Sequence, residues 1–275
     1  MLHAARHFTY LAMVLVAPLL VFTACEAPPD EQDTEEGVVL APGERAPAID
    51  GATARFVSPE SEEVLEPGEV EVRVAVENFI PGSQTEVPRL DRIANSEQGQ
   101  HTHIILNNDP YFANYNIEAD PFSIGELEPG AYSAFVFPSR SFHESVKSDD
   151  AADLVNFYVG EDAVGEPFPL EHGEPSIIYS RPKGTYSGEG AERIMLDFYL
   201  YNVMLSEDGF RAHYTIEHDD HDEPLAELTM HEWTPAFVEG LESGTYTFTL
   251  ALLDENGEQV PGSFNYTERE VVVER

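Results

Sequence analysis

Two stretches of this chain repeat one another, and the repeat limits the fold more than any other feature of the sequence. GQHTHIILNNDPY, at residues 99–111, is followed by GELEPGAYSAFVF, at residues 125–137. Further along, GFRAHYTIEHDD, at residues 209–220, is followed by VEGLESGTYTFTLALLD, at residues 238–254. Similar segments in the same order predict two tandem domains that share one fold.

Each copy carries a Leu-x-x-Gly-x-Tyr step, at residues 127–132 and 241–246, that leads into an alternating strand. This step resembles the tyrosine corner of immunoglobulin-like and fibronectin type III sandwiches, in which a Tyr hydrogen-bonds back to the preceding turn. Apolar and polar residues also alternate at residues 70–76 and 246–252, as in strands with one buried face. We therefore predict an all-β protein with two tandem immunoglobulin/fibronectin III-like β-sandwich domains.

Changes in composition predict where these domains begin and end. Residues 25–50 combine acidic residues with prolines and show no apolar periodicity, which predicts a disordered acidic linker. We assign residues 51–160 to the first sandwich and residues 174–275 to the second. Residues 161–173 are rich in Glu, Gly and Pro and are expected to form a hinge between them.

The N-terminus has the pattern of a lipoprotein signal peptide. Arg6 is followed by an uncharged, apolar stretch that ends in Phe-Thr-Ala directly before Cys25, the only cysteine of the chain. We predict that residues 1–24 are removed and that Cys25 is lipidated, with palmitate-type chains anchoring the protein outside the cytoplasm, in the periplasm or on the cell surface. An uncleaved anchor helix is the alternative. A lone cysteine also excludes an intrachain disulfide.

The chain is strongly acidic, with 52 Asp plus Glu against 14 Lys plus Arg and a formal net charge of −38. Repulsion among these charges weakens a compact state in dilute buffer and is screened at high salt, where the Debye length falls to about 3 Å at 1 M. The composition therefore indicates a halophilic source. It also predicts that nucleic acid is not a partner.

The histidines of the first copy lie two residues apart on a predicted strand, so their side chains point to the same face. Alignment with the second copy leaves His101, His103 and Ile105 facing away from the core of the first domain. The same reasoning places Phe135 and Phe137 outward on the neighbouring strand. These residues are expected to form one outer sheet face that binds a partner.

The segment after that strand brings His143 and Glu144 towards the edge of this face. Three imidazoles and a carboxylate are the ligand set of a zinc or copper site, to which Asp109 and Tyr111 could add. Two other interpretations stay open at this point: the second domain packs on this face, or the histidines are simply solvated. A separate acidic and histidine-rich run at residues 218–223 is expected to be a solvated loop.

No catalytic machinery is readable in the sequence. There is no GxSxG elbow and no glycine-rich phosphate loop, and lipidation occupies the only thiol. We therefore expect a non-enzymatic, membrane-anchored binding or structural module without a cofactor, with a protein, peptide or envelope polymer as its partner. The alternative is a metal-binding lipoprotein that uses the histidine cluster to hold Zn or Cu.

Several segments resemble a known family. GQHTHIILNNDPY, LEPGAY, SRSFHES and LVNFYVG, within residues 99–160, and IIYSRPKGTYSGEGAERIMLDFYLYN, at residues 177–202, are similar to uncharacterised bacterial lipoproteins sometimes labelled phosphopeptide-binding. The resemblance covers nearly all of the folded chain. Phosphate recognition usually requires a cluster of arginines, and only Arg140 is expected near the candidate face, so the label is not carried over as a function.

Overall fold

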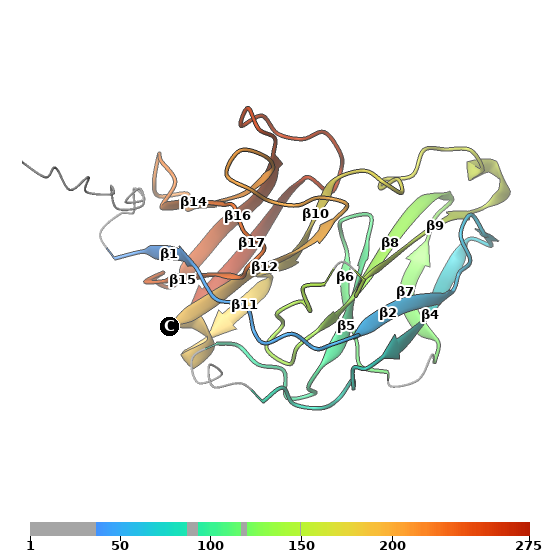
Figure 1. Cartoon of the computed structure of the whole chain (residues 1–275), viewed down its shortest axis with the longest axis horizontal. Helices are drawn as coiled ribbons and strands as arrows, with labels where there is room; N and C mark the ends of the chain where they lie inside the picture. The colour runs from blue at the N-terminus through green and yellow to red at the C-terminus, as the bar shows by residue number, and fades with distance from the viewer. Residues whose placement is uncertain (1–36, 87–92, 117–119, 149) are drawn as a thin grey trace, which may run out of the picture. The chain divides into compact units, whose positions relative to one another are not determined.

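The computed structural model describes residues 37–86, 93–116, 120–148 and 150–275 (Figure 1). The predicted signal peptide and Cys25 lie outside these residues. In the part of the chain that is described, no helix has the length and apolar character needed to cross a bilayer.

The N-terminal sandwich consists of two sheets (Figure 1). The smaller sheet contains, in spatial order, β2 (Thr53–Ser58), β4 (Gly68–Glu77) and β7 (Phe122–Leu127). The larger sheet contains, in spatial order, β3 (Val64–Leu65), β9 (Asp153–Val159), β8 (Gly130–Ser139), β5 (His101–Leu106) and β6 (Tyr111–Asn114). Alternation of buried and exposed residues along β4 directs its valines into a core that includes Ile104 and Val136 of the opposite sheet.

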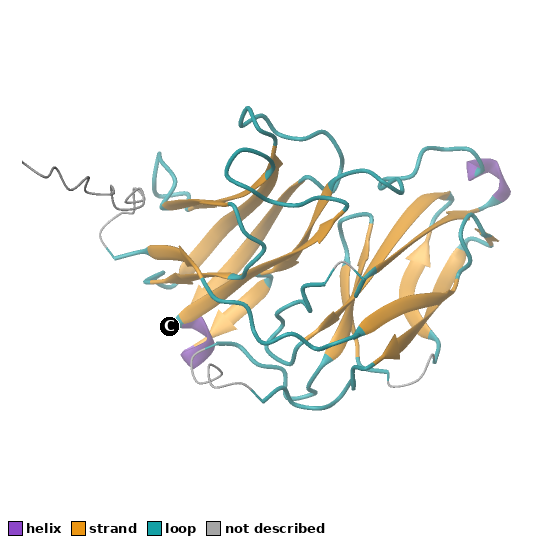
Figure 2. Cartoon of the chain, in the orientation of Figure 1, coloured by secondary structure: helices purple, strands orange, loops and turns teal. Residues whose placement is uncertain are grey.

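The C-terminal sandwich repeats this plan. Its first sheet contains, in spatial order, β1 (Val39–Pro42), β15 (Ala236–Glu239), β12 (Arg193–Tyr201) and β10 (Ser176–Arg181). Its second sheet contains, in spatial order, β11 (Gly184–Ser187), β17 (Tyr266–Glu274), β16 (Gly244–Leu253), β13 (Arg211–Glu217) and β14 (Ala226–Met230). The only helices in the described residues are the short 3₁₀ helices η2 (Glu161–Ala163) and η3 (Gly188–Ala191) (Figure 2). The predicted all-β sandwich class is confirmed.

Both tyrosine corners are present. The Tyr132 hydroxyl donates to the Glu128 carbonyl at 2.8 Å, and the Tyr246 hydroxyl donates to the Glu242 carbonyl at 3.0 Å. Each tyrosine lies on the strand that pairs with the first strand of its repeat, since β8 pairs with β5 and β16 pairs with β13. The two copies of the repeat therefore fold in the same local way.

The chain enters the fold through the C-terminal sandwich. β1 pairs antiparallel with β15, from Val39 opposite Glu239 to Pro42 opposite Ala236, and Leu40 is buried in the core of that sandwich. The predicted disordered linker therefore does not extend through Val39–Pro42. So short a strand needs only one buried apolar side chain and a few main-chain hydrogen bonds. It therefore leaves no alternating pattern of apolar residues in the sequence.

The segment between the sandwiches, which was expected to be a hinge, contacts the N-terminal sandwich at Leu170. The main-chain N–H of Leu170 donates to the Ser133 hydroxyl at 3.0 Å, and the Asn156 amide donates to the Leu170 carbonyl at 2.9 Å. The Leu170 side chain is itself buried. The segment is therefore held against the N-terminal sandwich at this residue.

The outer face of β5 and β8 is covered. As predicted, Phe135 and Phe137 point away from the N-terminal core while Ala134 lies within it. Both phenylalanines are nevertheless fully buried, because they pack on Tyr199 of β12 with ring centroids 5.5 and 5.0 Å from its ring. Ile105 is buried in the same cluster. The exposed binding face predicted at Ile105, Phe135 and Phe137 is therefore wrong, and the other interpretation, that the second domain packs on this face, is the one that the structure shows.

Phe135→Ala tests how much this contact stabilises the fold. Removing a fully buried aromatic ring is expected to lower the free energy of unfolding by about 3 to 5 kcal/mol, measured by denaturant titration. Val57→Ala, at a side chain that is 52% exposed, is the control and should change stability little. A loss below about 1 kcal/mol for Phe135→Ala would contradict the assigned interface.

Candidate metal centre

His101 and His103 lie on the same face of β5, as their spacing predicted, but both are completely buried. Their Nε2 atoms are 2.8 Å apart. The ring of Phe137, on the paired strand β8, contacts His103 with its centroid 5.2 Å from the imidazole. The packing of the C-terminal sandwich that buries the phenylalanines therefore excludes water from these two imidazoles as well.

His143 reaches the same point from a tight turn after β8. The turn is closed by the His143 N–H, which donates to the Arg140 carbonyl at 2.8 Å, and His143 has a left-handed backbone with φ of 72°. Because His101 pairs with Ser139 at the end of β8, the turn folds back beside it. The Nδ1 atom of His143 lies 3.2 Å from Nε2 of His101. The predicted convergence of the three histidines is present.

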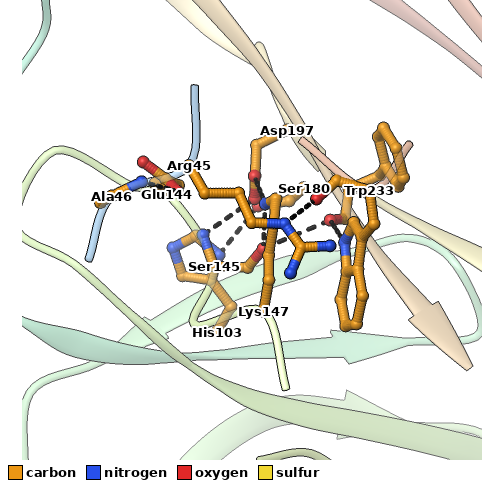
Figure 3. Close-up of polar contacts among 10 residues, drawn as sticks. Arg45, Ala46, His103, Glu144, Ser145, Lys147, Ser180, Asp197 and Trp233 are labelled. Atoms are coloured by element: carbon orange, nitrogen blue, oxygen red, sulfur yellow. Dashed lines mark hydrogen bonds and ion pairs between the residues drawn. The ribbon is translucent and has the colours of Figure 1, made fainter. Parts of the chain in front are cut away.

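Residues of the C-terminal sandwich complete the site. The Ser180 hydroxyl lies 3.2 Å from Nδ1 of His103, and Figure 3 shows this pair. Arg181 donates from Nη2 to Nδ1 of His143 at 2.8 Å and to the Tyr111 hydroxyl at 3.0 Å. The register of β10 is irregular between Tyr179 and Arg181. An irregularity of this kind redirects side chains, and here two successive ones, at Ser180 and Arg181, reach the histidines.

The hydrogen bonds assign the tautomers of two imidazoles. Nδ1 of His101 lies 2.9 Å from the Gly99 carbonyl, which only accepts, so Nδ1 carries the proton and Nε2 has a free lone pair. Nδ1 of His143 is likewise unprotonated, because its single lone pair accepts the hydrogen bond from Arg181. These two unprotonated nitrogens lie 3.2 Å apart.

Burial keeps the imidazoles neutral. It lowers the pKa of His101 to about 4 and holds the pKa of His103 well below its ordinary value, with the charge of Arg181 acting in the same direction. The pKa of His143 is lowered by burial and by Arg181 as well. Metal ligands must be deprotonated, so at neutral pH all three nitrogens are in the form that binds a cation.

Positive charge surrounds the cluster. Lys183 lies over the Tyr111 ring, 4.0 Å from its centroid, and burial lowers the pKa of this lysine to about 8. Ser180, Arg181 and Lys183 lie at the site although no motif of the sequence predicted them there. The signal that points to them is composition, because Arg181 and Lys183 form a basic pair in a chain with only 14 basic residues.

Glu144 does not join the histidines, so its predicted role as a ligand is wrong. Its carboxylate accepts from the Ala46 N–H at 2.9 Å, an interaction drawn in Figure 3, and burial raises the pKa of this group. Successive residues of a turn point in different directions, which separates Glu144 from His143. Asp109 is also outside the cluster, near Arg269, whereas the Tyr111 hydroxyl lies 2.5 Å from Nε2 of His103.

Metal-ligating side chains come together once in the described part of the chain. The ligand atoms of His101, His103 and His143 all lie within 4.8 Å of one another. The acidic and histidine-rich run at residues 218–223 forms no such group and lies in an exposed turn. The three-histidine cluster is therefore the candidate site.

Comparison with known proteins shows no family. No family model and no curated protein matches the chain. Among solved structures, the fibronectin(III)-like modules of Clostridium thermocellum CbhA are 13% identical, with 81% of this chain and 94% of that chain covered and a TM-score of 0.26. The FN1–FN3 domains of chicken CNTN1 are 10% identical, with 78% and 69% covered and a TM-score of 0.25. Likenesses this weak carry no argument about function, and the resemblance to bacterial lipoproteins stays a prediction.

The neutral histidines predict an acid-sensitive fold in the metal-free protein. Histidines of the unfolded chain take up protons near pH 6.5, while burial prevents His101 from doing so until about pH 4. The unfolded state therefore binds more protons in this window. Stability is highest above pH 6.5 and falls as the pH is lowered, by up to about 1.4 kcal/mol per pH unit for each histidine.

Urea titrations at several pH values between 6.5 and 4 measure this effect. Carboxylates contribute to the same slope, so the comparison is between wild type and His103→Gln, which should lose stability less steeply on acidification. His221→Gln, at an exposed position, is the matched control and should keep the wild-type slope. Equal slopes for wild type and His103→Gln would show that His103 is not buried in its neutral form.

Proposed function

We propose that this protein is a lipid-anchored, extracytoplasmic metal-binding protein that holds a Zn or Cu ion with His101, His103 and His143. The observation that carries the proposal is the convergence of three buried imidazoles, whose ligand atoms lie within 4.8 Å of one another. A cation that displaces Arg181 from His143 would bind Nδ1 of His143 together with Nε2 of His101, 3.2 Å away. Imidazole nitrogen is a ligand that both zinc and copper accept.

The contacts on the far side of the rings support this assignment. A histidine that ligates a metal usually donates its other N–H to a carbonyl or a similar acceptor, which fixes the ring. His101 donates from Nδ1 to the Gly99 carbonyl, and Nδ1 of His103 lies within hydrogen-bonding distance of the Ser180 hydroxyl. Both histidines therefore present Nε2 to the centre of the cluster.

The spacing of the nitrogens fits one small ion. Metal–nitrogen distances of about 2.0 to 2.1 Å around a tetrahedral ion place ligand nitrogens about 3.3 Å apart. Nε2 of His101 lies 2.8 Å from Nε2 of His103 and 3.2 Å from Nδ1 of His143. The third pair, His103 and His143, has its ligand atoms within 4.8 Å of each other, so the rings have to rotate for all three nitrogens to reach the ideal spacing. The guanidinium of Arg181, which now donates to His143, has to leave that nitrogen when a cation binds.

Binding rather than turnover is the proposed role. Catalytic sites combine a metal with a base or nucleophile, and the buried carboxylate of Glu144 is engaged with Ala46 instead of the cluster. Three histidines leave one tetrahedral position, for which the Tyr111 hydroxyl, 2.5 Å from His103 Nε2, is a nearby protein oxygen. The chain is thus suited to storing or delivering an ion at the cell envelope.

The anchoring part of the proposal rests on the sequence. The apolar stretch that ends at Cys25 and the absence of any other cysteine support lipidation at that residue. The described fold begins after it, at residue 37. The proposed metal site would then be presented outside the cytoplasm, close to the membrane.

Metal analysis of the purified protein tests the site. The wild-type protein is reconstituted with Zn²⁺ or Cu²⁺ and then dialysed. It is expected to retain one ion per chain, as measured by elemental mass spectrometry. His101→Ala and His103→Ala each remove one of three ligands and should reduce retention by at least about tenfold, as losses around metal sites commonly do.

His218→Ala, in the exposed acidic run, is the matched control and should leave retention unchanged. Glu144→Gln should also retain the ion, since this carboxylate lies outside the cluster. Circular dichroism confirms that each variant is folded. Failure of the wild type to retain stoichiometric zinc or copper would overturn the proposed function.

Fractionation of cells tests the anchor independently of the metal. The wild-type chain is expected in the membrane fraction and to incorporate labelled palmitate. Cys25→Ser should abolish the label and release the folded protein from the membrane fraction. Thr34→Ala, in the same acidic segment, is the control and should keep the label. A wild-type chain without lipid would refute the anchoring proposal and leave the metal proposal untouched.

A further inference from the structure

A second polar cluster joins the two sandwiches away from the histidines. Lys147 follows β8 of the N-terminal sandwich, and its Nζ forms an ion pair with Oδ1 of Asp197 on β12. The side chain of Lys147 is 2% exposed and that of Asp197 is fully buried. Two opposite charges are therefore in direct contact, out of water, between parts of the chain 50 residues apart.

Ser145 fixes the orientation of both partners, as Figure 3 shows. Its main-chain N–H donates to Oδ2 of Asp197 at 3.0 Å, and its hydroxyl accepts from Nζ of Lys147 at 2.8 Å. The same hydroxyl donates to the Phe198 carbonyl at 3.2 Å. One oxygen of the carboxylate is thus held by the backbone, and the amine is held against the other.

The choice of lysine at this position is unusual in this chain. Only two of its 14 basic residues are lysines, so Arg is the ordinary cation of this protein. Arginine is also the residue better suited to buried ion pairs, because its planar guanidinium forms two parallel hydrogen bonds to a carboxylate. A lysine has one property that arginine lacks: its amine can lose a proton and act as a nucleophile.

We propose that Lys147 and Asp197 condense to form an intramolecular isopeptide bond between the two sandwiches. A proton passes from Nζ to Oδ1 along the existing hydrogen bond and leaves a neutral amine beside a carboxylic acid. Nζ attacks Cγ of Asp197, the new N–C bond forms, and the C–Oδ1 bond breaks. The departing hydroxyl takes the second proton from Nζ and leaves as water. No oxidant or other reactant is required.

Burial and preorganisation favour this reaction. Holding two reacting groups in contact corresponds to effective concentrations that reach about 10⁵ M or more in well-oriented intramolecular reactions. The product is a neutral amide, whereas the starting pair places two charges in an apolar interior at a large desolvation cost. A groove lined by Lys147, Tyr201 and Trp233, among others, adjoins the amine and gives the released water a path to solvent.

Such a bond would supply a covalent cross-link that the chain cannot make through sulfur. Its single cysteine, Cys25, excludes an intrachain disulfide. A link from residue 147 to residue 197 closes a loop that contains the end of the N-terminal sandwich and the start of the C-terminal one. By restricting the unfolded chain, it would stabilise the pair of sandwiches as a disulfide does.

Intact mass spectrometry of the denatured full chain tests the proposal, with Cys25→Ser used throughout to avoid lipid heterogeneity. The measured mass is expected to fall below that of the sequence by one water molecule. Digestion with trypsin should yield one branched peptide that contains both Lys147 and Asp197. Lys147→Met and Asp197→Ala should each restore the full mass.

Lys183→Met, at the only other lysine, is the matched control and should keep the deficit of one water. If a variant at Lys147 or Asp197 fails to fold, the intact mass of the chain that keeps both residues still shows whether one water molecule has been lost. A full sequence mass would overturn the proposal. A deficit that maps to any other pair of residues would overturn it as well. Neither result bears on the metal site.

Discussion

The contact on which this structure depends is the burial of one sheet face of the N-terminal sandwich by β12 of the C-terminal sandwich. Phe135 and Phe137 lie on the outer side of β8 and pack on the ring of Tyr199. An exposed face of this kind would be an apolar patch on a protein whose surface is otherwise strongly acidic. Covering it joins the two sandwiches, and the same burial creates the environment of both polar clusters described above.

That environment explains why each cluster has its particular chemistry. His103 lies beside Phe137 on paired strands, so the imidazoles lose their hydration when the phenylalanines do, and their neutral form is favoured. Lys147 and Asp197 lie at the edge of the same contact and also lose water. Desolvation makes unpaired polar atoms costly, and it also strengthens any bond that satisfies them. The proposed metal ion at one cluster and the proposed covalent bond at the other would each satisfy such polar atoms.

The sequence was informative wherever a local rule decided the outcome. Period-2 alternation predicted which side of β5 and β8 carries His101 and Phe135, and the Gly-x-Tyr steps predicted both tyrosine corners. The sequence was misleading wherever the exposure of a residue depends on which other part of the chain packs against it. The outward direction of Phe135 was correct, but nothing local indicates that β12 covers it. Arg181 reaches the histidines through an irregular register in β10, and a turn directs Glu144 away from them, so neither position follows from spacing alone.

The way the chain enters the fold has a mechanical consequence. Val39–Pro42 adds a strand to the edge of the C-terminal sandwich before the N-terminal sandwich begins. A force applied from the N-terminal side would therefore first load the ladder between β1 and β15. The hydrogen bonds between antiparallel strands lie perpendicular to the strands, so a pull along β1 would shear several of them together instead of opening them one at a time. The pairing of this short strand would therefore resist such a force at the edge of the C-terminal sandwich before the force reaches the contact that holds the histidines in place.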